Sequence, residues 1–309
     1  EISWISQYNF FSRLMYRVFI KINKELSFRK NALYSVLSSI IDILKPSIII
    51  TNYDNAFQKM SYLKKEYPDI LVISVQNGVR LSSVGDLNYI PTNTHLDTYF
   101  GFGDYEYQLM TNRGAVIDNY YAVGSLKNGL FLSANKDLDK EYDICYASHY
   151  SSQGYTSNDP LLQRMFDVTK DIIVKINNIC KENNLKFVIA TTKQDFNFSC
   201  RTNTFLDEVK LLKEIGIKDH QIIPNIYNKL TTYDTCYKSK LNIGFISTVN
   251  YEVFGSFTKV IFCAAADSII RNDLMRKNLE KMPEEILLDS LDEKSLSDKI
   301  FYLLKMSDV

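Results

Sequence analysis

The residues best suited to chemistry lie in the segment 241–263, LNIGFISTVNYEVFGSFTKVIFC. An apolar run ends there in Ser247 and Thr248, a helical pattern starts at once, and Glu252 falls within its first turn and a half. Hydroxyls and free backbone N–H groups at a helix start favour a phosphate or diphosphate. A carboxylate one turn further along can accept hydrogen bonds from two ribose hydroxyls. The other interpretation is that Ser247 or Thr248 only caps the helix and Glu252 is a surface acid that offsets the helix dipole.

Polar loops follow two other apolar runs in this half of the chain. The loop 148–154, SHYSSQG, offers the hydroxyls of Ser148 and Ser151 and a closing glycine that permits close approach of a phosphate. Lys193 follows the next predicted strand and is placed to neutralise a leaving nucleotide. Tyr227 and Tyr233 are candidates to stack on a nucleobase. The simpler interpretations are an unliganded polar loop and a solvated lysine.

Similar loops occur in the first half of the chain. Asp54 follows the apolar run SIIIT, while Asn77, Arg80 and Asp86 follow the run ILVISV. Asp54 and Asp86 are each a candidate general base, or a candidate nucleophile if the reaction retains the configuration of the sugar. Asn77 belongs to an Asn-Gly turn, and Arg80 offers a bidentate contact to phosphate or carboxylate. The simpler interpretation is an ordinary strand-to-helix turn with solvated acids.

Helical and short apolar patterns alternate along the whole chain, which is typical of an α/β protein with parallel sheets. Strands are predicted at 47–51, 70–75, 98–102, 120–123, 142–147, 186–191, 241–247 and 259–264. Helices are predicted at 31–45, 56–67, 105–111, 161–183, 205–214, 249–256 and 295–305. The charged stretch 130–141 indicates a junction between domains at 1–130 and 142–309. Ligands of open parallel sheets lie beyond the carboxyl ends of the strands, where the loops described above are found.

Composition and motifs exclude several classes of function. The 36 basic and 36 acidic residues balance, which argues against a dedicated nucleic-acid partner. Five scattered cysteines without a CxxC pair predict reduced thiols in a cytosol, and no metal site is predicted because the three histidines form no ligand-spaced cluster. The motifs GxxxxGK[ST], GxGxxG and GxSxG are absent, which excludes the ordinary phosphate loop, a dinucleotide site and the nucleophile elbow of hydrolases.

Apolar runs and the N-terminal segment give expectations about where in the cell the protein is found. No uninterrupted apolar run approaches the length of about 18 residues that a membrane span needs, so a cytoplasmic protein is predicted. The basic, aromatic segment 12–30 is a candidate for peripheral contact with the inner face of the cell membrane, and the alternative is a solvated helix face. The sequence opens inside a predicted helix at 10–26, which suggests that earlier strands of the first domain are missing.

The segment 241–263 resembles the donor-binding motif of GT-B glycosyltransferases, in which a strand, a Ser/Thr turn and an E-x-x-G helix precede another strand. Three further stretches point the same way: IITNYDN, VQNGVRLSSVGDL and VGSLKN. The resemblance covers about residues 46–265 and is greatest to transferases of surface-carbohydrate or O-antigen biosynthesis. Residues 76–78, QNG, depart from the histidine–glycine pair of related polyol-phosphate polymerases, so no histidine base is expected in that loop.

The resemblance implies a GT-B-like α/β fold with two facing Rossmann-like domains. It also implies metal-independent transfer of a sugar from a nucleotide-sugar to a cell-surface glycan or lipid-linked acceptor, without a further cofactor. The donor would be held by Ser247, Thr248, Glu252, Lys193, Ser148 and Ser151, and the acceptor side would carry Asp54, Asn77, Arg80 and Asp86. Three rival functions stay open: a polyol-phosphate transferase, a sugar epimerase on the same scaffold, and a non-catalytic subunit of a glycan-assembly complex.

Overall fold

A computed structural model of the chain describes residues 40–52, 57–79, 94–135, 138–150, 158, 160–194, 202–226, 229–245, 247–267 and 282–307. The helix predicted at 10–26 and the segment 12–30 lie outside these ranges. Within them, no helix has both the length and the apolar character that crossing a membrane requires.

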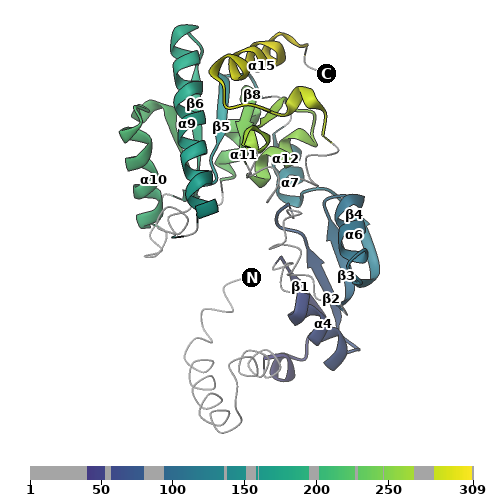
Figure 1. Ribbon diagram of the computed structural model, residues 1–309. Coiled ribbons are helices and arrows are strands. Elements are labelled where there is room, and N and C mark those ends of the chain that lie inside the picture. Colours follow the sequence, from purple (N-terminus) through teal and green to yellow (C-terminus); the bar gives the residue numbers. More distant parts are fainter. Residues whose placement is uncertain are drawn as a thin grey trace.

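The first sheet has four parallel strands in sequence order. They are β1 (Ile48–Thr51), β2 (Leu71–Val75), β3 (His95–Gly101) and β4 (Val116–Ala122). Helix α4 (Phe57–Glu66) connects β1 to β2, and α6 (Asp104–Thr111) connects β3 to β4. Phe57, Leu63, Leu96, Tyr99 and Met110 form the centre of its core. This sheet builds the lower lobe in Figure 1.

The second sheet has five parallel strands in the order β7-β6-β5-β8-β9. They are β5 (Tyr142–Ala147), β6 (Phe187–Gln194), β7 (Ile222–Asn225), β8 (Ser239–Gly244) and β9 (Val260–Phe262). This is the doubly wound order, and the chain reverses its winding between β5 and β8. The carboxyl ends of those two strands therefore flank the topological switch point of the sheet.

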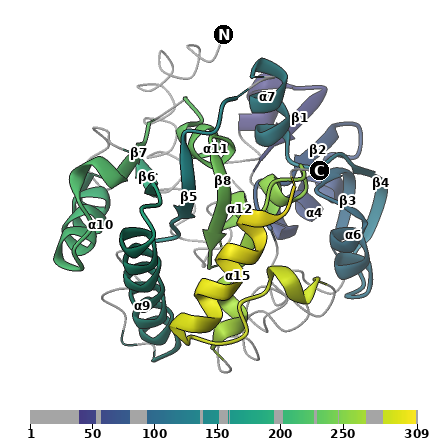
Figure 2. The same ribbon diagram turned by 90° about the horizontal axis from the view of Figure 1, so that it is seen from above.

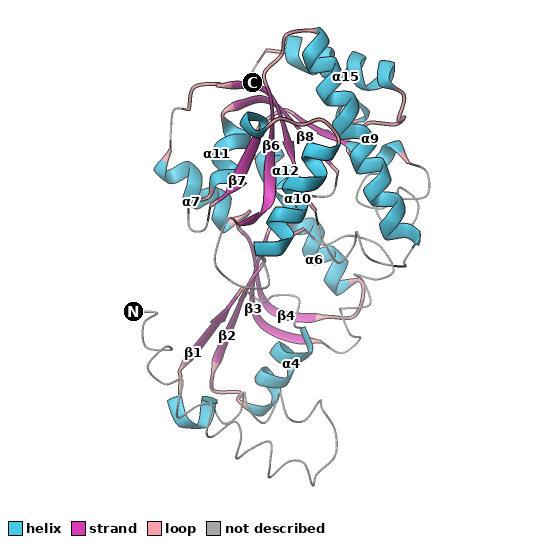
Figure 3. Ribbon diagram, turned by 90° about the vertical axis from the view of Figure 1, so that its left-hand side faces the viewer, coloured by secondary structure: helices cyan, strands magenta, loops and turns pink. Residues whose placement is uncertain are grey.

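Helices cover both faces of the second sheet (Figure 2). One face packs against α9 (Pro160–Glu182), α10 (Thr202–Glu214) and α15 (Glu293–Lys305). The other packs against α11 (Thr231–Tyr237), α12 (Thr248–Phe254) and α7 (Leu126–Ala134). Short 3-10 turns occur at Asp219–Gln221, Cys263–Ala266 and Glu284–Ile286. The prediction of two Rossmann-like α/β domains with parallel sheets is confirmed, and Figure 3 shows the strands of each lobe.

Helix α7 follows β4 and packs on the second sheet. Ser125 caps it, because the Ser125 Oγ accepts a hydrogen bond from the backbone N–H of Asn128 at 3.2 Å. Phe131 is buried among the side chains of α11, with ring centroids 5.4 Å from Tyr237 and 6.1 Å from Tyr233. The chain thus remains helical through Ala134, inside the stretch 130–141 that the sequence predicts as a junction.

Besides helix α7, strand β7 and helix α11 of the second domain are not predicted from the sequence. Strand β7 is only four residues long, IIPN, and half-buried along its length, so it lacks a continuous apolar run. Helix α11, TTYDTCY, has four buried residues, two of which are tyrosines and one a threonine. Its buried face therefore mixes polar and apolar groups, and the spacing of hydrophobic residues in the sequence does not reveal the helix.

Candidate functional site

The loops after β5 and β8 meet at the switch point of the second sheet. Ala147 and Gly244, the last residues of these strands, are paired in register. Ser148 comes next along the first strand, is buried, and its Oγ accepts a hydrogen bond from the backbone N–H of Tyr150 at 3.2 Å. Open parallel sheets bind ligands at this place because two loops diverge and leave a crevice.

The turn before α12 occupies the other side of this switch point. Ser247 stands at the N-cap position with extended backbone angles, yet its side chain makes no capping hydrogen bond to the helix. Thr248 faces the first domain, since a Cβ atom at Gly78 would lie 3.3 Å from the Thr248 Oγ1. The predicted Ser247-Thr248 turn and the predicted QNG turn of the first domain are therefore neighbours across the two lobes.

Glu252 is a buried acid with two strong hydrogen bonds. Glu252 is 9% exposed. One of its carboxylate oxygens accepts a hydrogen bond from the Ser125 hydroxyl and the other accepts one from the Tyr233 hydroxyl, both at 2.6 Å. Burial raises the pKa of Glu252, and the hydrogen bonds from Ser125 and Tyr233 partly oppose that shift. The interpretation of Glu252 as a surface acid is therefore wrong. Tyr233 stacks on Phe131 and binds Glu252, so its predicted role on a nucleobase is also not supported.

A cavity of about 540 Å³ lies between the two domains, with Glu252 in its wall. The first domain contributes the loop after β2 and the start of α6, and the second contributes the later part of α12. The described residues that line it are Val79, Phe102, Gly103, Tyr105, Glu106, Gln108, Gly124, Ser125, Asn128, Tyr251, Glu252, Gly255, Ser256 and Met282. Its volume is within the range of about 300–1,000 Å³ that small-molecule sites occupy.

The QNG turn after β2 is held by hydrogen bonds of two amide side chains. Gln76 is buried; its Nε2 donates to the Gly78 carbonyl at 2.9 Å, and its Oε1 accepts from the Phe102 N–H at 2.8 Å. Asn77 is exposed, and its Nδ2 donates to the Asn52 carbonyl at 2.7 Å. Gln76 therefore fixes the loops after β2 and β3 together, and Asn77 ties in the loop after β1. Sequence reasoning chose Asn77 and missed Gln76.

Comparisons with known proteins agree with this architecture. No protein-family model matches the chain, and no curated protein matches it in sequence. A UDP-GlcNAc 2-epimerase from Methanocaldococcus jannaschii, solved with UDP-GlcNAc and UDP, matches 90% of this chain and 75% of its own at 14% identity and a TM-score of 0.56. A Listeria monocytogenes protein described as a UDP-N-acetylglucosamine 2-epimerase matches 89% of this chain and 71% of its own at 12% identity and a TM-score of 0.54. The chain has the GT-B fold. A wall teichoic acid polymerase, TagF, matches more loosely at 12% identity and a TM-score of 0.48.

Several predicted site residues lie outside the described part of this GT-B chain. Asp54, Arg80, Asp86, Ser151 and Tyr227 belong to such loops. Lys193 lies near the carboxyl end of β6, and its backbone alone is described. Asn77, Ser148 and the pair Ser247-Thr248 follow the carboxyl ends of β2, β5 and β8. Of the predicted site residues, Glu252 alone is among the described residues that line the cavity. The predicted roles of all these residues stay predictions.

His149 lies in the loop after β5, and sequence reasoning did not select it as a site residue. It directly follows Ser148, and its ring stacks on Phe245 with centroids 5.2 Å apart and planes 16° apart. Its Nδ1 is buried and makes no hydrogen bond with the described residues. Burial lowers the pKa of His149 to about 4, so the imidazole is neutral at pH 7. The signal in the sequence is a histidine two residues after the strand predicted at 142–147.

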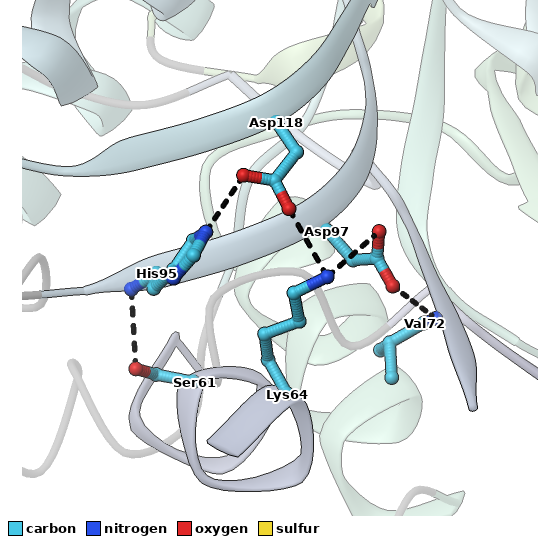
Figure 4. Close-up of polar contacts among 6 residues, drawn as sticks. All are labelled: Ser61, Lys64, Val72, His95, Asp97 and Asp118. Carbon is cyan, nitrogen blue, oxygen red and sulfur yellow. Dashed lines mark hydrogen bonds and ion pairs between the residues drawn. The ribbon is translucent and has the colours of Figure 1, made fainter. Parts of the chain in front are cut away.

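A second polar cluster lies at the opposite end of the first sheet (Figure 4). The Lys64 Nζ lies 3.3 Å from a carboxylate oxygen of Asp97 and 3.0 Å from one of Asp118, and the His95 Nε2 lies 2.7 Å from Asp118. The hydrogen bond with His95 lowers the pKa of Asp118. Ser61 accepts a hydrogen bond from the backbone N–H of His95, at 3.1 Å. The Ser61 hydroxyl therefore contacts the backbone of His95 and not its imidazole ring, so the ring does not act as a base on this serine. The ion pairs of Lys64 with Asp97 and Asp118 hold α4 against β3 and β4.

Proposed function

We propose that this protein is a glycosyltransferase that moves a sugar from a nucleotide-sugar donor to a cell-surface glycan or a lipid-linked acceptor. The observation that carries the proposal is Glu252, a buried carboxylate in the wall of the cavity between two GT-B lobes. Burying an acid is costly, and acids with raised pKa values in clefts are concentrated at functional sites. Each Glu252 oxygen accepts one described hydrogen bond and has a lone pair for a second, which suits the neighbouring hydroxyls of a ribose.

The remaining roles follow from the positions around the crevice. The hydroxyls of Ser247 and Thr248 are proposed to bind donor phosphates, together with Lys193 and the loop that carries Ser148 and Ser151. Positive side chains and backbone N–H groups would stabilise the leaving nucleotide without a metal ion. Asp54, Asn77, Arg80 and Asp86 are proposed for the acceptor side. With a lipid-linked acceptor, the protein would act at the inner face of the cell membrane, and the segment 12–30 would contact the membrane surface.

A sugar epimerase is the second candidate. Two solved structures with TM-scores above 0.5 are named as UDP-GlcNAc 2-epimerases, which favours this activity over a polyol-phosphate transferase and a non-catalytic subunit. The products separate the candidates. An epimerase changes the sugar without any acceptor, a glycosyltransferase releases a nucleoside diphosphate only with an acceptor, and a polyol-phosphate transferase releases a nucleoside monophosphate. Mass spectrometry and NMR of reactions with and without acceptor would therefore assign the class.

The direct test is the variant Glu252→Gln. Glutamine keeps the shape but cannot accept hydrogen bonds on both ends, so we expect nucleotide-sugar affinity to fall by about tenfold or more in calorimetry. The free energy of unfolding should not fall in parallel, because the variant no longer buries an acid with a raised pKa.

The matched control is Glu182→Gln, at the exposed end of α9, which should leave affinity unchanged. Unchanged affinity in Glu252→Gln would remove the ribose role. No thermal shift of the wild-type protein with UDP, GDP, CDP or their sugar conjugates would instead favour a non-catalytic subunit.

A further inference from the structure

Asn250, in the first turn of α12, has a buried side-chain amide that makes no hydrogen bond. The residue is 0% exposed, and neither its Nδ2 nor its Oδ1 bonds to any group that the structure describes. The side-chain amides of the other buried asparagines in the described ranges, Asn128, Asn177 and Asn242, all make hydrogen bonds. Because burying both polar atoms of an amide without partners is costly, such a group in a native structure calls for a physical reason.

An unpaired acceptor lies on the same face of the second sheet. Asn242 of β8 is buried and its Nδ2 donates to the Cys236 carbonyl at 3.1 Å, but its Oδ1 makes no hydrogen bond with the described residues. Alternate residues of a strand share a face, so Asn242 and Gly244 both face α11 and α12. The Asn250 amide lies directly against Gly244, where an added Cβ atom would collide with the Asn250 Nδ2. An unpaired donor and an unpaired acceptor are therefore close together between β8 and α12.

The first turn of α12 is fastened less firmly than the rest of the helix. Further along, Glu252 accepts hydrogen bonds from the hydroxyls of Ser125 and Tyr233. At the start, the Ser247 side chain makes no capping hydrogen bond, and the Asn250 amide adds none to the described residues. Segments held by few hydrogen bonds move at a low cost in free energy.

We propose that Asn250 is a positioning residue for the proposed donor site, and that its Nδ2 donates to the Asn242 Oδ1 when a nucleotide-sugar binds at the turn after β8. A small displacement of the first turn of α12 along β8 would join the two groups and would carry Ser247 and Thr248 with it. The free protein bears the cost of the unpaired groups and the liganded protein does not, so the pairing adds to affinity. This inference rests on the proposed function, which supplies the ligand.

Two alanine variants compare an unpaired amide with a paired one. Asn250→Ala removes unpaired polar atoms, so the free energy of unfolding without ligand should not fall, whereas affinity for the tightest-binding of UDP, GDP and CDP should fall about tenfold. Asn177→Ala removes an acceptor that the Gln221 Nε2 uses at 3.2 Å, so it should lower the free energy of unfolding and leave affinity unchanged. Denaturant titration and calorimetry measure the two quantities. Asn250→Ala that is destabilised as much as Asn177→Ala, or that binds as tightly as the wild type, would contradict the inference.

A double-mutant cycle tests the pairing of Asn250 with Asn242. Asn242→Ala also breaks the hydrogen bond to Cys236 and should lower stability by itself, so the test is the coupling between the two changes. We expect them to be additive in the free energy of unfolding without ligand. In affinity they should not be additive, and the double variant should bind about tenfold more weakly than the wild type instead of about a hundredfold. Coupling in the free protein, or additive losses of affinity, would show that the two amides do not pair on binding.

Failure of the proposed function has a different signature. If UDP, GDP, CDP and their sugar conjugates all fail to shift the thermal unfolding of the wild-type protein, the donor site is wrong and the inference fails with it. If a nucleotide binds to the wild type and equally well to Asn250→Ala, the inference alone fails and the nucleotide proposal stands.

Discussion

At the residue scale, burial favours the uncharged form of two titratable groups of the second domain, Glu252 and His149. Burial raises the pKa of the Glu252 carboxyl, and it lowers the pKa of the His149 imidazole to about 4. The two groups are in different parts of the second domain, one on α12 and one after β5. An environment that disfavours charge on both an acid and a base has a low effective dielectric, in which hydrogen bonds to a ligand gain strength.

His149 should make stability depend on pH on the acid side. Its ordinary pKa of 6.5 applies in the unfolded chain and about 4 in the folded one, so between these values only the unfolded chain binds the proton. The free energy of unfolding should therefore fall as pH drops from 6.5 to 4, by up to about 3 kcal/mol. Urea unfolding at pH 7 and pH 4.5 measures this. His149→Phe keeps a ring against Phe245 and should lose that part of the pH dependence, whereas His220→Phe, on the exposed turn before β7, should retain it.

At the element scale, one amide fastens α7 to two helices of the second domain. The Asn128 Nδ2 donates to the Glu252 carbonyl at 3.0 Å and to the Ser256 Oγ at 2.7 Å, while its Oδ1 accepts from the Tyr237 hydroxyl at 2.8 Å. Asn128 is buried, so these bonds are protected from competition with water.

Asn128→Ala should therefore lower the free energy of unfolding by about 2–3 kcal/mol, since it removes three buried hydrogen bonds and leaves their partners unsatisfied. Tyr237→Phe removes one of them and should cost about 1 kcal/mol. Denaturant titration measures both, with Lys127→Ala on the exposed side of α7 as the control. Equal and small effects of all three variants would show that α7 is held by Phe131 packing alone.

The elements that sequence could predict are those with local signals. The apolar runs SIIIT, ILVISV and YDICYA predict parallel strands without reference to the rest of the chain, although only the third of these strands is mostly buried. Strand β7 and helix α11 depend on half-buried and polar positions whose burial follows from docking against other elements. The same division holds in the candidate site. Glu252 is selected by its spacing within one segment. Phe102, Tyr105 and Glu106 join it in the cavity wall only through the packing of the two lobes.

At the scale of the whole molecule, the two lobes meet where the chemistry is proposed. The chain passes from β4 to α7 through Gly124, whose φ of +72° favours glycine, and α7 stays with the second domain. The QNG turn and the start of α12 approach each other again at Gly78 and Thr248, where a Cβ atom added to Gly78 would lie 3.3 Å from the Thr248 Oγ1. We therefore expect the width of the cavity to depend on this backbone crossing and on the close approach of Gly78 to Thr248.

Gly78→Val tests whether this contact controls the site. The valine Cβ would already lie 3.3 Å from the Thr248 Oγ1, and its two methyl groups need space that the closed arrangement lacks. We expect the lobes to separate, which small-angle X-ray scattering would detect as a larger radius of gyration, and nucleotide-sugar affinity to fall. The second change Thr248→Ala removes the opposing Oγ1 and should restore part of both quantities, as coupled neighbours do.

If Gly78→Val alone leaves the radius and the affinity unchanged, the lobes adjust elsewhere and the contact does not set the width of the cavity. If the second change gives no recovery, the valine acts on the conformation of its own turn, where Gln76 holds the Gly78 carbonyl, instead of on the spacing of the lobes.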